Sequence, residues 1–433
     1  MRRSSPTRFL ALLLLLCATV TGAAAQSTVV ANISVNAGEH ERIDVPISAA
    51  LSGVSLRLAE GELRLFETTG GKNLLVPSQL SGGNPDQLSW ILAGTTAPRA
   101  VRTFELRVQK GAAAPAPAPA SAVKVTDDGN GLQIAIGDKP VLGYRYTPMP
   151  VPDGVREVFS GSGFIHPLYS PQGEVITRIQ PPDHRHHYGI ENPWTHTEFE
   201  GRSVDFWNLG SGQGKVRVAG VIARSSGEVF GGFRSLHEHV DFTGPAGPKV
   251  ALDEEWDVKV WNLSPERKVW IIDFASTLNP ATAQPITIKA YRYQGFSMRA
   301  TEKWGDQNTT LLTSEGLNKS NANSTRARWI DVNGASDVPA GHSGVLFMTN
   351  PTNFNFPEHL RIWPTGQNGG LANVYINFNP AQDRDWPLLP GHTYGLKYRM
   401  FVYDGTITAR EAERLWNDYA NPPRVDVRPG QGS

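Results

Sequence analysis

The sequence predicts an all-β protein, in which a small β-sandwich domain precedes a large antiparallel two-sheet β-sandwich and one helix lies near the C-terminus. Runs that alternate apolar and polar residues recur along the chain, and clusters rich in Gly, Asn and Pro separate them. The 433 residues include 43 Gly, 32 Pro and 11 Trp, a composition that suits β-rich proteins with many turns. So many long antiparallel strands favour two stacked sheets, and the mutarotase-like supersandwich is the candidate type.

The first 25 residues have the pattern of a signal peptide. Arg2, Arg3 and Arg8 form a basic start, Phe9–Val20 is an apolar run too short to span a membrane, and Ala23–Ala25 offers a cleavage site. The single cysteine of the chain lies within the apolar run, so the mature protein has no disulfide of its own. We therefore expect an exported protein, either periplasmic or secreted, with no transmembrane segment.

A Pro/Ala linker at residues 112–122 divides the rest of the chain. The segment before it, residues 26–111, is short and carries no chemical constellation, which favours a small β-sandwich domain that supports the rest. Its expected strands are Val29–Val35, Arg42–Ile47, Leu56–Phe66, Leu88–Leu92 and Thr103–Val108.

The segment at residues 123–404 is presumed to be the functional domain, because the chemically unusual motifs fall within it. Its expected strands are Val216–Ala223, Val229–Phe242, Ala251–Trp261, Val269–Leu278, Ile286–Tyr293, Val345–Thr349, Val374–Phe378 and His392–Tyr403. Residues 405–433 are expected to form a helix and a tail. Thr406 or Thr408 can cap a helix over Ala409–Tyr419, and Pro422 and Pro423 stop it.

The charge balance argues against nucleic acid and anionic membranes as partners. The chain holds 41 basic and 41 acidic residues, and three of the basic ones lie in the predicted signal peptide, so the mature chain is slightly acidic. No phosphate-binding Gly loop, nucleophile elbow or H-E-x-x-H helix is present in the sequence. Exported proteins that are rich in Trp and near neutral often bind sugars, because indole faces stack on pyranose rings.

The most informative motif is the histidine-rich stretch at residues 164–190. It contains His166, His184, His186 and His187, and Asp183 stands directly before the last three. Imidazole bound beside carboxylate suits one divalent transition metal, Zn, Fe, Mn or Ni, with His184, His186 and His166 as ligands. The alternative is a site without metal, in which His184 or His187 acts as general acid or base and Asp183 orients it.

Other candidate site residues lie on the expected strands and loops. Glu254 begins the apolar face of a strand, where burial would raise the pKa of its carboxyl and make it a general acid. His237 and His239 share one strand face, which we interpret as a solvated face in preference to a groove lining. The expected substrate-binding residues are His166, Arg292, Tyr188, His359 and Trp194.

Three runs together resemble a known family. They are HPLYSP-x-GEV-x-T, then PPDH-x-HH-x-G, then DFWN at Asp205–Asn208, and the closing LKYR-x-FVYDG at Leu396–Gly405 agrees with them. The combination is similar to the exported bacterial family known as PmoA-like or DUF6807. That resemblance covers nearly the whole mature chain and implies work on carbohydrates, because such proteins accompany sugar oxidoreductases and isomerases.

Taken together, these features predict an exported enzyme that cleaves a glycosidic bond in a saccharide or glycoside. Cleavage is either hydrolytic or an elimination from an oxidised (keto) sugar by His/Asp acid–base chemistry, assisted by a metal or not. One alternative is a sugar epimerase or mutarotase that uses one His and one Glu. Another is a carbohydrate-binding protein without catalysis.

Overall fold

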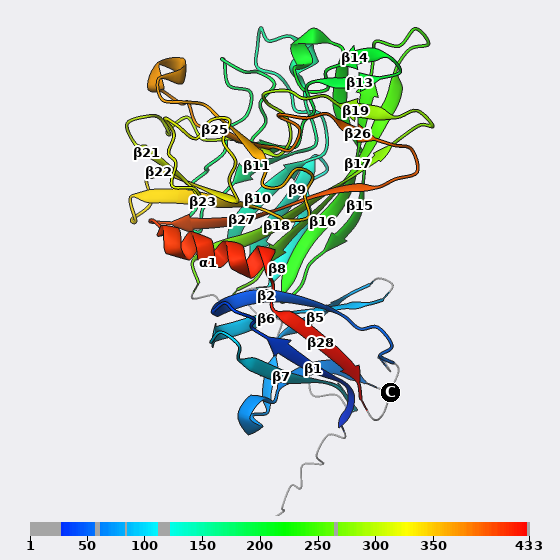
Figure 1. Cartoon of the computed structure of the whole chain (residues 1–433), viewed down its shortest axis with the longest axis vertical. Coiled ribbons are helices and arrows are strands. Elements are labelled where there is room, and N and C mark those ends of the chain that lie inside the picture. The colour runs from blue at the N-terminus through cyan, green and yellow to red at the C-terminus, as the bar shows by residue number, and fades with distance from the viewer. Residues whose placement is uncertain (1–26, 57–60, 83–84, 111–121, 264–266, 431–433) are drawn as a thin grey trace, which may run out of the picture.

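The computed structural model describes residues 27–56, 61–82, 85–110, 122–263 and 267–430. Within these ranges the chain forms antiparallel β-sheets and a single C-terminal α-helix (Figure 1), which confirms the predicted all-β, sandwich-like class. The predicted signal peptide and residues 112–121 of the predicted linker lie outside the described residues.

The small domain consists of two sheets with strand orders β28-β1-β7-β3-β4 and β2-β6-β5. Trp90, Leu92, Phe104 and Leu106 belong to the separate apolar core of this domain, where alternate residues of the strands are buried. The strands are β1 Ser27–Asn36, β2 Arg42–Ala50, β3 Glu62–Glu67, β4 Leu74–Val76, β5 Ser78–Ser81, β6 Gln87–Thr96, β7 Val101–Gln109 and β28 Arg424–Pro429.

The end of the chain returns to the beginning of the fold. β28 pairs antiparallel with β1, from Ala31 opposite Pro429 to Asn36 opposite Arg424 (Figure 1). The sequence predicts a tail here and not a strand, because RVDVRP is short and polar and its partner strand lies at the other end of the chain. The small domain is therefore built from both ends of the described chain.

The large domain contains two eight-stranded sheets and a four-stranded sheet within the described residues. The orders are β24-β25-β20-β12-β11-β10-β9-β8, then β15-β16-β17-β18-β27-β23-β22-β21, then β14-β13-β19-β26. The first sheet comprises β8 Val123–Asp127, β9 Gly131–Ile136, β10 Lys139–Arg145, β11 Phe164–Leu168, β12 Ile190–Glu191, β20 Ser297–Arg299, β24 His359–Ile362 and β25 Tyr375–Asn379. The second comprises β15 Gly214–Ser225, β16 Phe230–Asp241, β17 Lys249–Trp261, β18 Val269–Pro280, β21 Thr309–Thr313, β22 Trp329–Ala335, β23 His342–Thr349 and β27 Tyr394–Asp404. The third comprises β13 Thr197–Phe199, β14 Arg202–Val204, β19 Ile286–Ile288 and β26 Trp386–Leu388.

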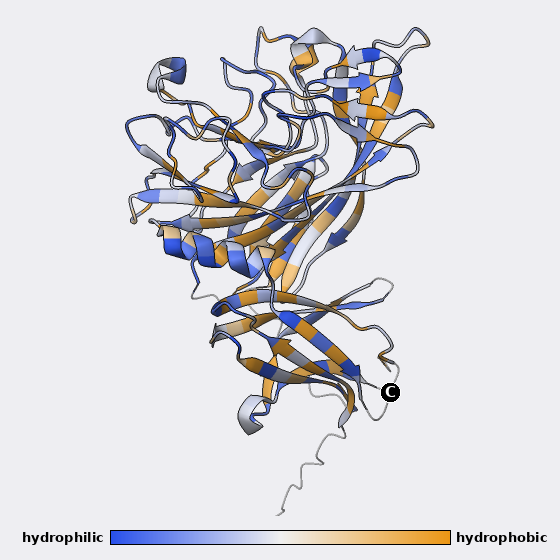
Figure 2. Cartoon of the chain, in the orientation of Figure 1, coloured by the Kyte–Doolittle hydropathy of each residue, from blue (hydrophilic) through white to orange (hydrophobic). Residues whose placement is uncertain are grey.

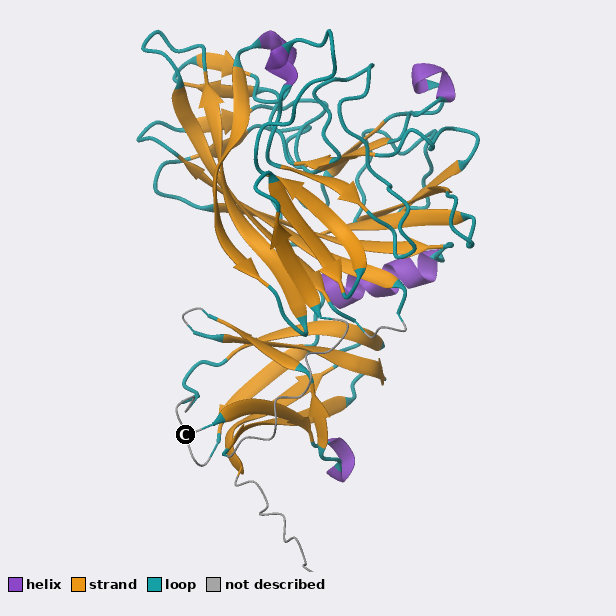
Figure 3. Ribbon diagram, turned by 180° about the vertical axis from the view of Figure 1, so that it is seen from behind, coloured by secondary structure: helices purple, strands orange, loops and turns teal. Residues whose placement is uncertain are grey.

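Strand alternation places the core between the two large sheets. On β17, Glu254, Trp256 and Val258 are buried, whereas Asp257 between them is exposed. Figure 2 shows the same alternation of hydrophobic and hydrophilic bands along the strands. Long loops gather at the end of the large domain that lies away from the small domain (Figure 3).

The C-terminal helix α1, Ala409–Ala420, lies against β22 and β23 on the outside of the second sheet. Thr408 caps it, because its side-chain oxygen accepts a hydrogen bond from the Glu411 backbone N–H at 3.2 Å. Leu415 and Trp416 are buried in the apolar cluster beneath the helix. No helix within the described ranges has the length and hydropathy needed to span a bilayer. Short 3₁₀ helices occur at η2 Thr69–Gly71, η3 Glu157–Phe159, η4 Leu209–Ser211 and η5 Gln367–Gly370.

Buried polar contacts join the two domains. The Arg42 guanidinium donates to the Asp418 carboxylate at 3.1 Å and to the backbone carbonyls of Asn417 and Asn421 at the end of α1. Gln79 Oε1 accepts hydrogen bonds from two backbone N–H groups at the start of β16. These contacts, together with the pairing of β28 with β1, hold the small domain against the large domain.

The return of β28 leads to a prediction about modularity. If a protease site is inserted within residues 112–122 and cut, the N-terminal fragment should stay bound to the rest of the chain, because β28 still pairs with β1. Gel filtration under native conditions should show one complex of full mass. Separation of the fragments would contradict this, and a variant that also lacks residues 424–433 should release the N-terminal fragment more easily.

Candidate active site

A narrow cavity lies where loops of the large domain cover β16 and β17. It measures about 40 Å³, which is room for about three water molecules. Its wall combines carboxyl, imidazole, ammonium and aromatic groups. The lining residues are Gly161, Ser162, Gly163, His186, Tyr188, Glu191, Asn192, Pro193, Phe206, Trp207, Leu209, Lys215, Val216, His237, Glu254 and Trp256.

Glu191 places a carboxyl group in this wall. Its neighbour Ile190 is fully buried and pairs with β11 on one side and β20 on the other, so the two-residue strand β12 is held in the middle of the first sheet. The backbone N–H of Tyr188 donates to Glu191 Oε1 at 2.8 Å. Burial raises the pKa of Glu191 to about 8. The Glu191 carboxyl is therefore mostly protonated at neutral pH.

Glu254 places a second carboxyl group in the same wall, in a very different environment. Its Oε1 accepts hydrogen bonds from Asn192 Nδ2 at 2.7 Å, Trp256 Nε1 at 2.8 Å and Ser276 Oγ at 2.6 Å. Its Oε2 lies 2.9 Å from His239 Nε2. Burial alone would raise the pKa of Glu254, but the hydrogen bond and charge of His239, with further help from neighbours, hold it below its ordinary value. Glu254 is therefore an ionised carboxylate, not the general acid that the sequence suggested.

Two carboxyl groups of opposite protonation thus face one cavity. Their environments push the two pKa values apart, and this separation distinguishes the acid from the ionised partner in enzymes that use two carboxyl groups. Glu191 can donate a proton, and Glu254 can stabilise positive charge. Two surface carboxyl groups with ordinary pKa values would both be ionised at neutral pH, so neither could act as the proton donor.

His186 and aromatic rings form another part of the wall. The His186 ring meets the Trp207 indole edge to face, with 5.3 Å between centroids. Burial lowers the pKa of His186 to about 3, so the imidazole is neutral. Tyr188 donates its hydroxyl proton to the Phe159 carbonyl and accepts from Gln180 Nε2, and burial raises its pKa to about 12. Burial also lowers the pKa of Lys215.

His187 lies behind this wall and packs between aromatic rings. It stacks on Trp207, with centroids 5.2 Å apart, and on Tyr375, with centroids 5.0 Å apart. His184 stacks against His187 at 4.7 Å and contacts Trp363 at 4.8 Å. Burial lowers the pKa of His187 well below its ordinary value. His184 and His187 are thus brought beside the cavity but are not among its lining residues.

Asp183 is engaged in an ion pair. One of its oxygens accepts from Arg299 Nη2 at 2.8 Å and from Asn368 Nδ2 at 2.8 Å, and it lies 3.1 Å from His184 Nδ1. Burial would raise the pKa of Asp183, but the Arg299 charge holds it below its ordinary value. Arg299 also covers the Trp363 ring, 4.3 Å from its centroid. This carboxylate orients His184 and neutralises a buried guanidinium.

The structure places His166 and Trp194 outside the cavity. His166 lines a second cavity, together with Gln133 and Tyr144, and its Nδ1 lies 2.9 Å from Thr177 Oγ1. Burial lowers the pKa of His166 to about 4. Trp194 is fully buried in the main core, where it contacts Trp386 edge to face at 6.0 Å. Trp194 therefore has a packing role.

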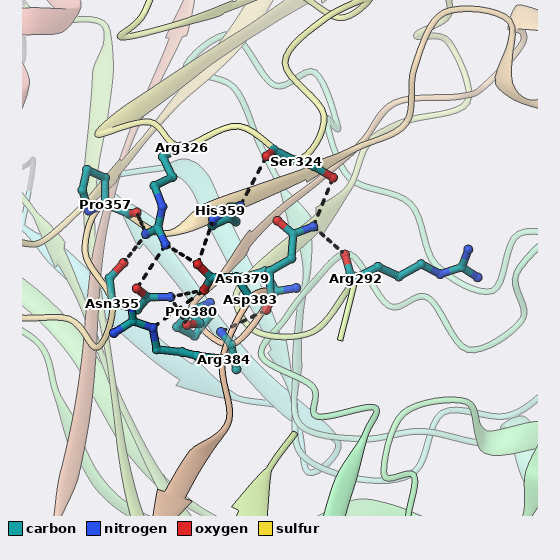
Figure 4. Close-up of polar contacts among 12 residues, drawn as sticks. Arg292, Ser324, Arg326, Asn355, Pro357, His359, Asn379, Pro380, Asp383 and Arg384 are labelled. Atoms are coloured by element: carbon teal, nitrogen blue, oxygen red, sulfur yellow. Dashed lines mark hydrogen bonds and ion pairs between the residues drawn. The ribbon is translucent and has the colours of Figure 1, made fainter. Parts of the chain in front are cut away.

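His359 and the backbone carbonyl of Arg292 belong to a separate polar cluster. His359 contacts the Ser324 carbonyl at 3.3 Å and the Asp383 carboxylate at 3.4 Å. The Arg292 side chain is exposed and extends away from this cluster (Figure 4), with its guanidinium over the Tyr293 ring at 5.2 Å. Glu254, the expected general acid, lines the cavity, whereas Arg292, an expected substrate-binding residue, does not.

The expected metal ligands are divided between two cavities. His186 lines the first cavity, with His184 beside it, whereas His166 lines the second. Within the described ranges, no group of three or more His, Cys, Asp or Glu side chains is placed to hold a metal ion. His184 and His186, whose ring centroids lie 5.6 Å apart, are the pair nearest to such an arrangement in the predicted set.

Several site residues were not foreseen from the sequence. Glu191 lines the cavity, and Arg299 binds the Asp183 carboxylate. His237 and His239 are fully buried, so the solvated strand face predicted for them is wrong. One signal was available for Glu191, because it is a lone carboxyl within the otherwise apolar or amide run from Tyr188 to Trp194.

A protein-family model matches most of the chain. The model of a family of unknown function, DUF6807, matches residues 131–417, which include every lining residue of the cavity. No curated protein matches the chain.

Proposed function

Since this chain belongs to the DUF6807 family, whose function is not established, we propose from the cavity itself that it is an exported carbohydrate-active enzyme that cleaves a glycosidic bond. The PmoA-like name and the carbohydrate association come from the sequence resemblance alone. The observation that carries the proposal is the pair of carboxyl groups with opposite protonation, Glu191 and Glu254. Such a pair is the usual machinery of glycoside cleavage.

In the proposed reaction, Glu191 gives its proton to the glycosidic oxygen as the C1–O bond breaks. The ionised Glu254 stabilises the positive charge that develops around the cavity. In hydrolysis, the neutral imidazole of His186 accepts a proton from the attacking water. In elimination from a 3-keto sugar, His186 instead takes the C2 proton, which the neighbouring carbonyl makes acidic, and a C1=C2 double bond forms.

The small volume of the cavity supports binding of only the reacting part of a sugar inside it. Room for about three water molecules, about 40 Å³, admits a hydroxyl or a carbonyl group but not a whole pyranose ring. The ring would then lie at the mouth, against the aromatic side chains that the cavity wall supplies. Lys215, on the same wall, can stabilise an enolate oxygen in the eliminative version.

A sugar epimerase or mutarotase is the second candidate, because the cavity also pairs one protonated carboxyl, Glu191, with neutral imidazoles. Such an enzyme would interconvert sugars without releasing an alcohol. A carbohydrate-binding protein without catalysis would need no acid with a raised pKa. A divalent metal remains part of the proposal, with His184 and His186 as its nearest ligands, and elemental analysis of protein purified without a metal-affinity tag tests it.

The experiment that tests the proposal compares p-nitrophenyl β-D-glucoside with its 3-keto derivative as substrates. Release of p-nitrophenol from either supports glycosidic cleavage. Incorporation of ¹⁸O from labelled water at C1 without a conjugated intermediate indicates hydrolysis, whereas transient absorbance of a conjugated carbonyl indicates elimination. Interconversion of the anomers or epimers of a free reducing sugar, with no p-nitrophenol release from either glycoside, would replace the proposal with the second candidate.

A further inference from the structure

One imidazole nitrogen on the cavity wall has no protein partner. His237 is fully buried and lines the cavity, and its Nδ1 has no hydrogen-bond partner among the described residues. Gly163 lies against this edge of the ring and places no side chain over it. A Cβ at Gly163 would lie only 3.1 Å from His237 Cε1 and 3.2 Å from Nδ1.

The other nitrogen of His237 is fully engaged. Nε2 lies 2.7 Å from the Tyr144 hydroxyl and 3.0 Å from Ser235 Oγ, and these two hydroxyls lie 2.8 Å from each other. Each hydroxyl brings one proton to this buried triangle. If Nε2 carries no proton, one hydroxyl donates to Nε2 and the second hydroxyl donates to the oxygen of the first. Both hydroxyl protons then have an acceptor.

The opposite tautomer satisfies the triangle less well. If Nε2 carried a proton, three protons would compete for two acceptor oxygens, and one hydroxyl proton would be left without an acceptor in the triangle. A buried donor without a partner is destabilising, because it has lost its hydrogen bonds to water and gains none in the protein. Proton counting therefore assigns the proton of His237 to Nδ1, the nitrogen on the edge that faces Gly163.

The surroundings keep this imidazole neutral. Burial lowers the pKa of His237 to about 4, against the opposing influence of the Glu254 charge and with a further lowering by His239. The Trp256 ring packs on it, with centroids 4.4 Å apart. The Nδ1–H group is thus a hydrogen-bond donor without a full charge throughout the neutral range.

A complementary acceptor lines the same cavity. Asn192 is buried, and its Nδ2 donates to Glu254 Oε1 at 2.7 Å and to Ser276 Oγ at 3.2 Å. These two bonds fix the amide orientation, so the acceptor is Oδ1, which has no partner in the described residues. A ligand with a carbonyl beside a hydroxyl can satisfy both groups.

We propose that His237 donates a hydrogen bond from Nδ1 to the carbonyl oxygen of an oxidised sugar bearing an α-hydroxycarbonyl group, while Tyr144 and Ser235 are positioning residues that fix its tautomer. The identity of the ligand rests on the proposed function, whereas the tautomer does not. The bond strengthens as negative charge grows on that oxygen, which favours the eliminative reaction.

The tautomer can be measured without a substrate. In protein labelled with ¹⁵N-histidine, the His237 signals are identified by their loss in His237→Asn, and long-range ¹H–¹⁵N spectra report which nitrogen carries the proton. We expect Nδ1–H in the wild type, in Tyr144→Phe and in Ser235→Ala, because one hydroxyl suffices to donate to Nε2. The double variant should lose this preference. An Nε2–H signal in the wild type overturns the proposal.

The donor role is tested with p-nitrophenyl 3-keto-β-D-glucoside. His237→Asn retains an amide close to the position of Nδ1, whereas His237→Gln places its amide near Nε2. We expect His237→Gln to lower kcat by about 100-fold or more with little change in KM, and His237→Asn to retain more activity. Equal kcat in the wild type and His237→Gln overturns the donor role. If the wild type itself leaves the probe uncleaved and its Nδ1 signal unmoved, both the ligand assignment and the proposed function fail, whereas an Nδ1 shift without cleavage supports the donor and removes only the proposed reaction.

Discussion

Replacing Glu191 with glutamine should lower kcat for glycoside cleavage by about 10²- to 10⁴-fold, the usual contribution of a general acid. The amide keeps the shape of the side chain and its acceptor for the Tyr188 N–H, but it cannot give up a proton. The wild-type rate should fall as the pH rises through about 8, where Glu191 loses its proton. The pH–rate profile of Glu191→Gln should lack this alkaline limb.

Glu191 should also make the stability of the free protein depend on pH. The folded pKa of Glu191 lies above its ordinary value of 4.5, so the folded state holds the proton more tightly than the unfolded state. This contribution is fully present below about pH 4.5 and is lost as the pH rises toward 8. The melting temperature of Glu191→Gln, relative to the wild type, should therefore rise over that interval.

Glu198→Gln is the matched control, because Glu198 is exposed on β13 in the same part of the chain. It should change neither the alkaline limb nor the pH dependence of stability. Wild-type activity without an alkaline limb, together with full activity of Glu191→Gln, would remove Glu191 from the mechanism.

Replacing Glu254 with leucine should destabilise the fold by about 3–5 kcal/mol. The change removes a buried charge that accepts from Asn192, Trp256 and Ser276 and contacts His239, and it leaves these polar groups buried without their partner. Glu254→Gln keeps one acceptor oxygen and should cost less. Urea denaturation followed by tryptophan fluorescence measures both changes.

The control for Glu254 is its neighbour Glu255, which faces the opposite side of β17 and pairs with the half-exposed Arg234. Glu255→Gln should change stability by less than about 1 kcal/mol. Since the folded pKa of Glu254 lies below its ordinary value of 4.5, its contribution is present above that pH and is lost as the pH falls through the folded pKa. The difference in the free energy of unfolding between the wild type and Glu254→Leu should therefore become smaller at acidic pH. If Glu254→Leu and Glu255→Gln lowered the free energy of unfolding by similar amounts, Glu254 would not be a buried carboxylate that stabilises the fold.

Much of the fold follows from the sequence because period-two alternation is a local signal. The predicted strands Val216–Ala223, Ala251–Trp261 and Val269–Leu278 correspond to β15, β17 and β18. The expected strand Ile286–Tyr293 is shorter in the structure, since β19 ends at Ile288. Strands of two or three residues, such as β12, carry no alternation long enough to detect. β28 was missed because its partner lies at the far end of the chain.

The site was predictable only in part. The histidine-rich stretch contributes His186 and Tyr188 to the cavity, and strand alternation correctly placed Glu254 on a buried face. Burial, however, did not decide its protonation, because Ser276 and His239 come from positions whose contacts the sequence cannot reveal. The sequence likewise did not reveal that His187 stacks on Trp207, because this contact joins residues that are distant in the chain.

The central claim is that Glu191 and Glu254 face one cavity in opposite protonation states. The most direct test is a ¹³C NMR titration of glutamate side-chain carboxyl carbons in the free protein, with Glu191→Gln and Glu254→Gln to assign the two signals. We expect the Glu191 signal to titrate near pH 8 and the Glu254 signal to titrate below 4.5. Titration of both groups at or below pH 4.5 would mean that no protonated acid is present at neutral pH, which would contradict the account.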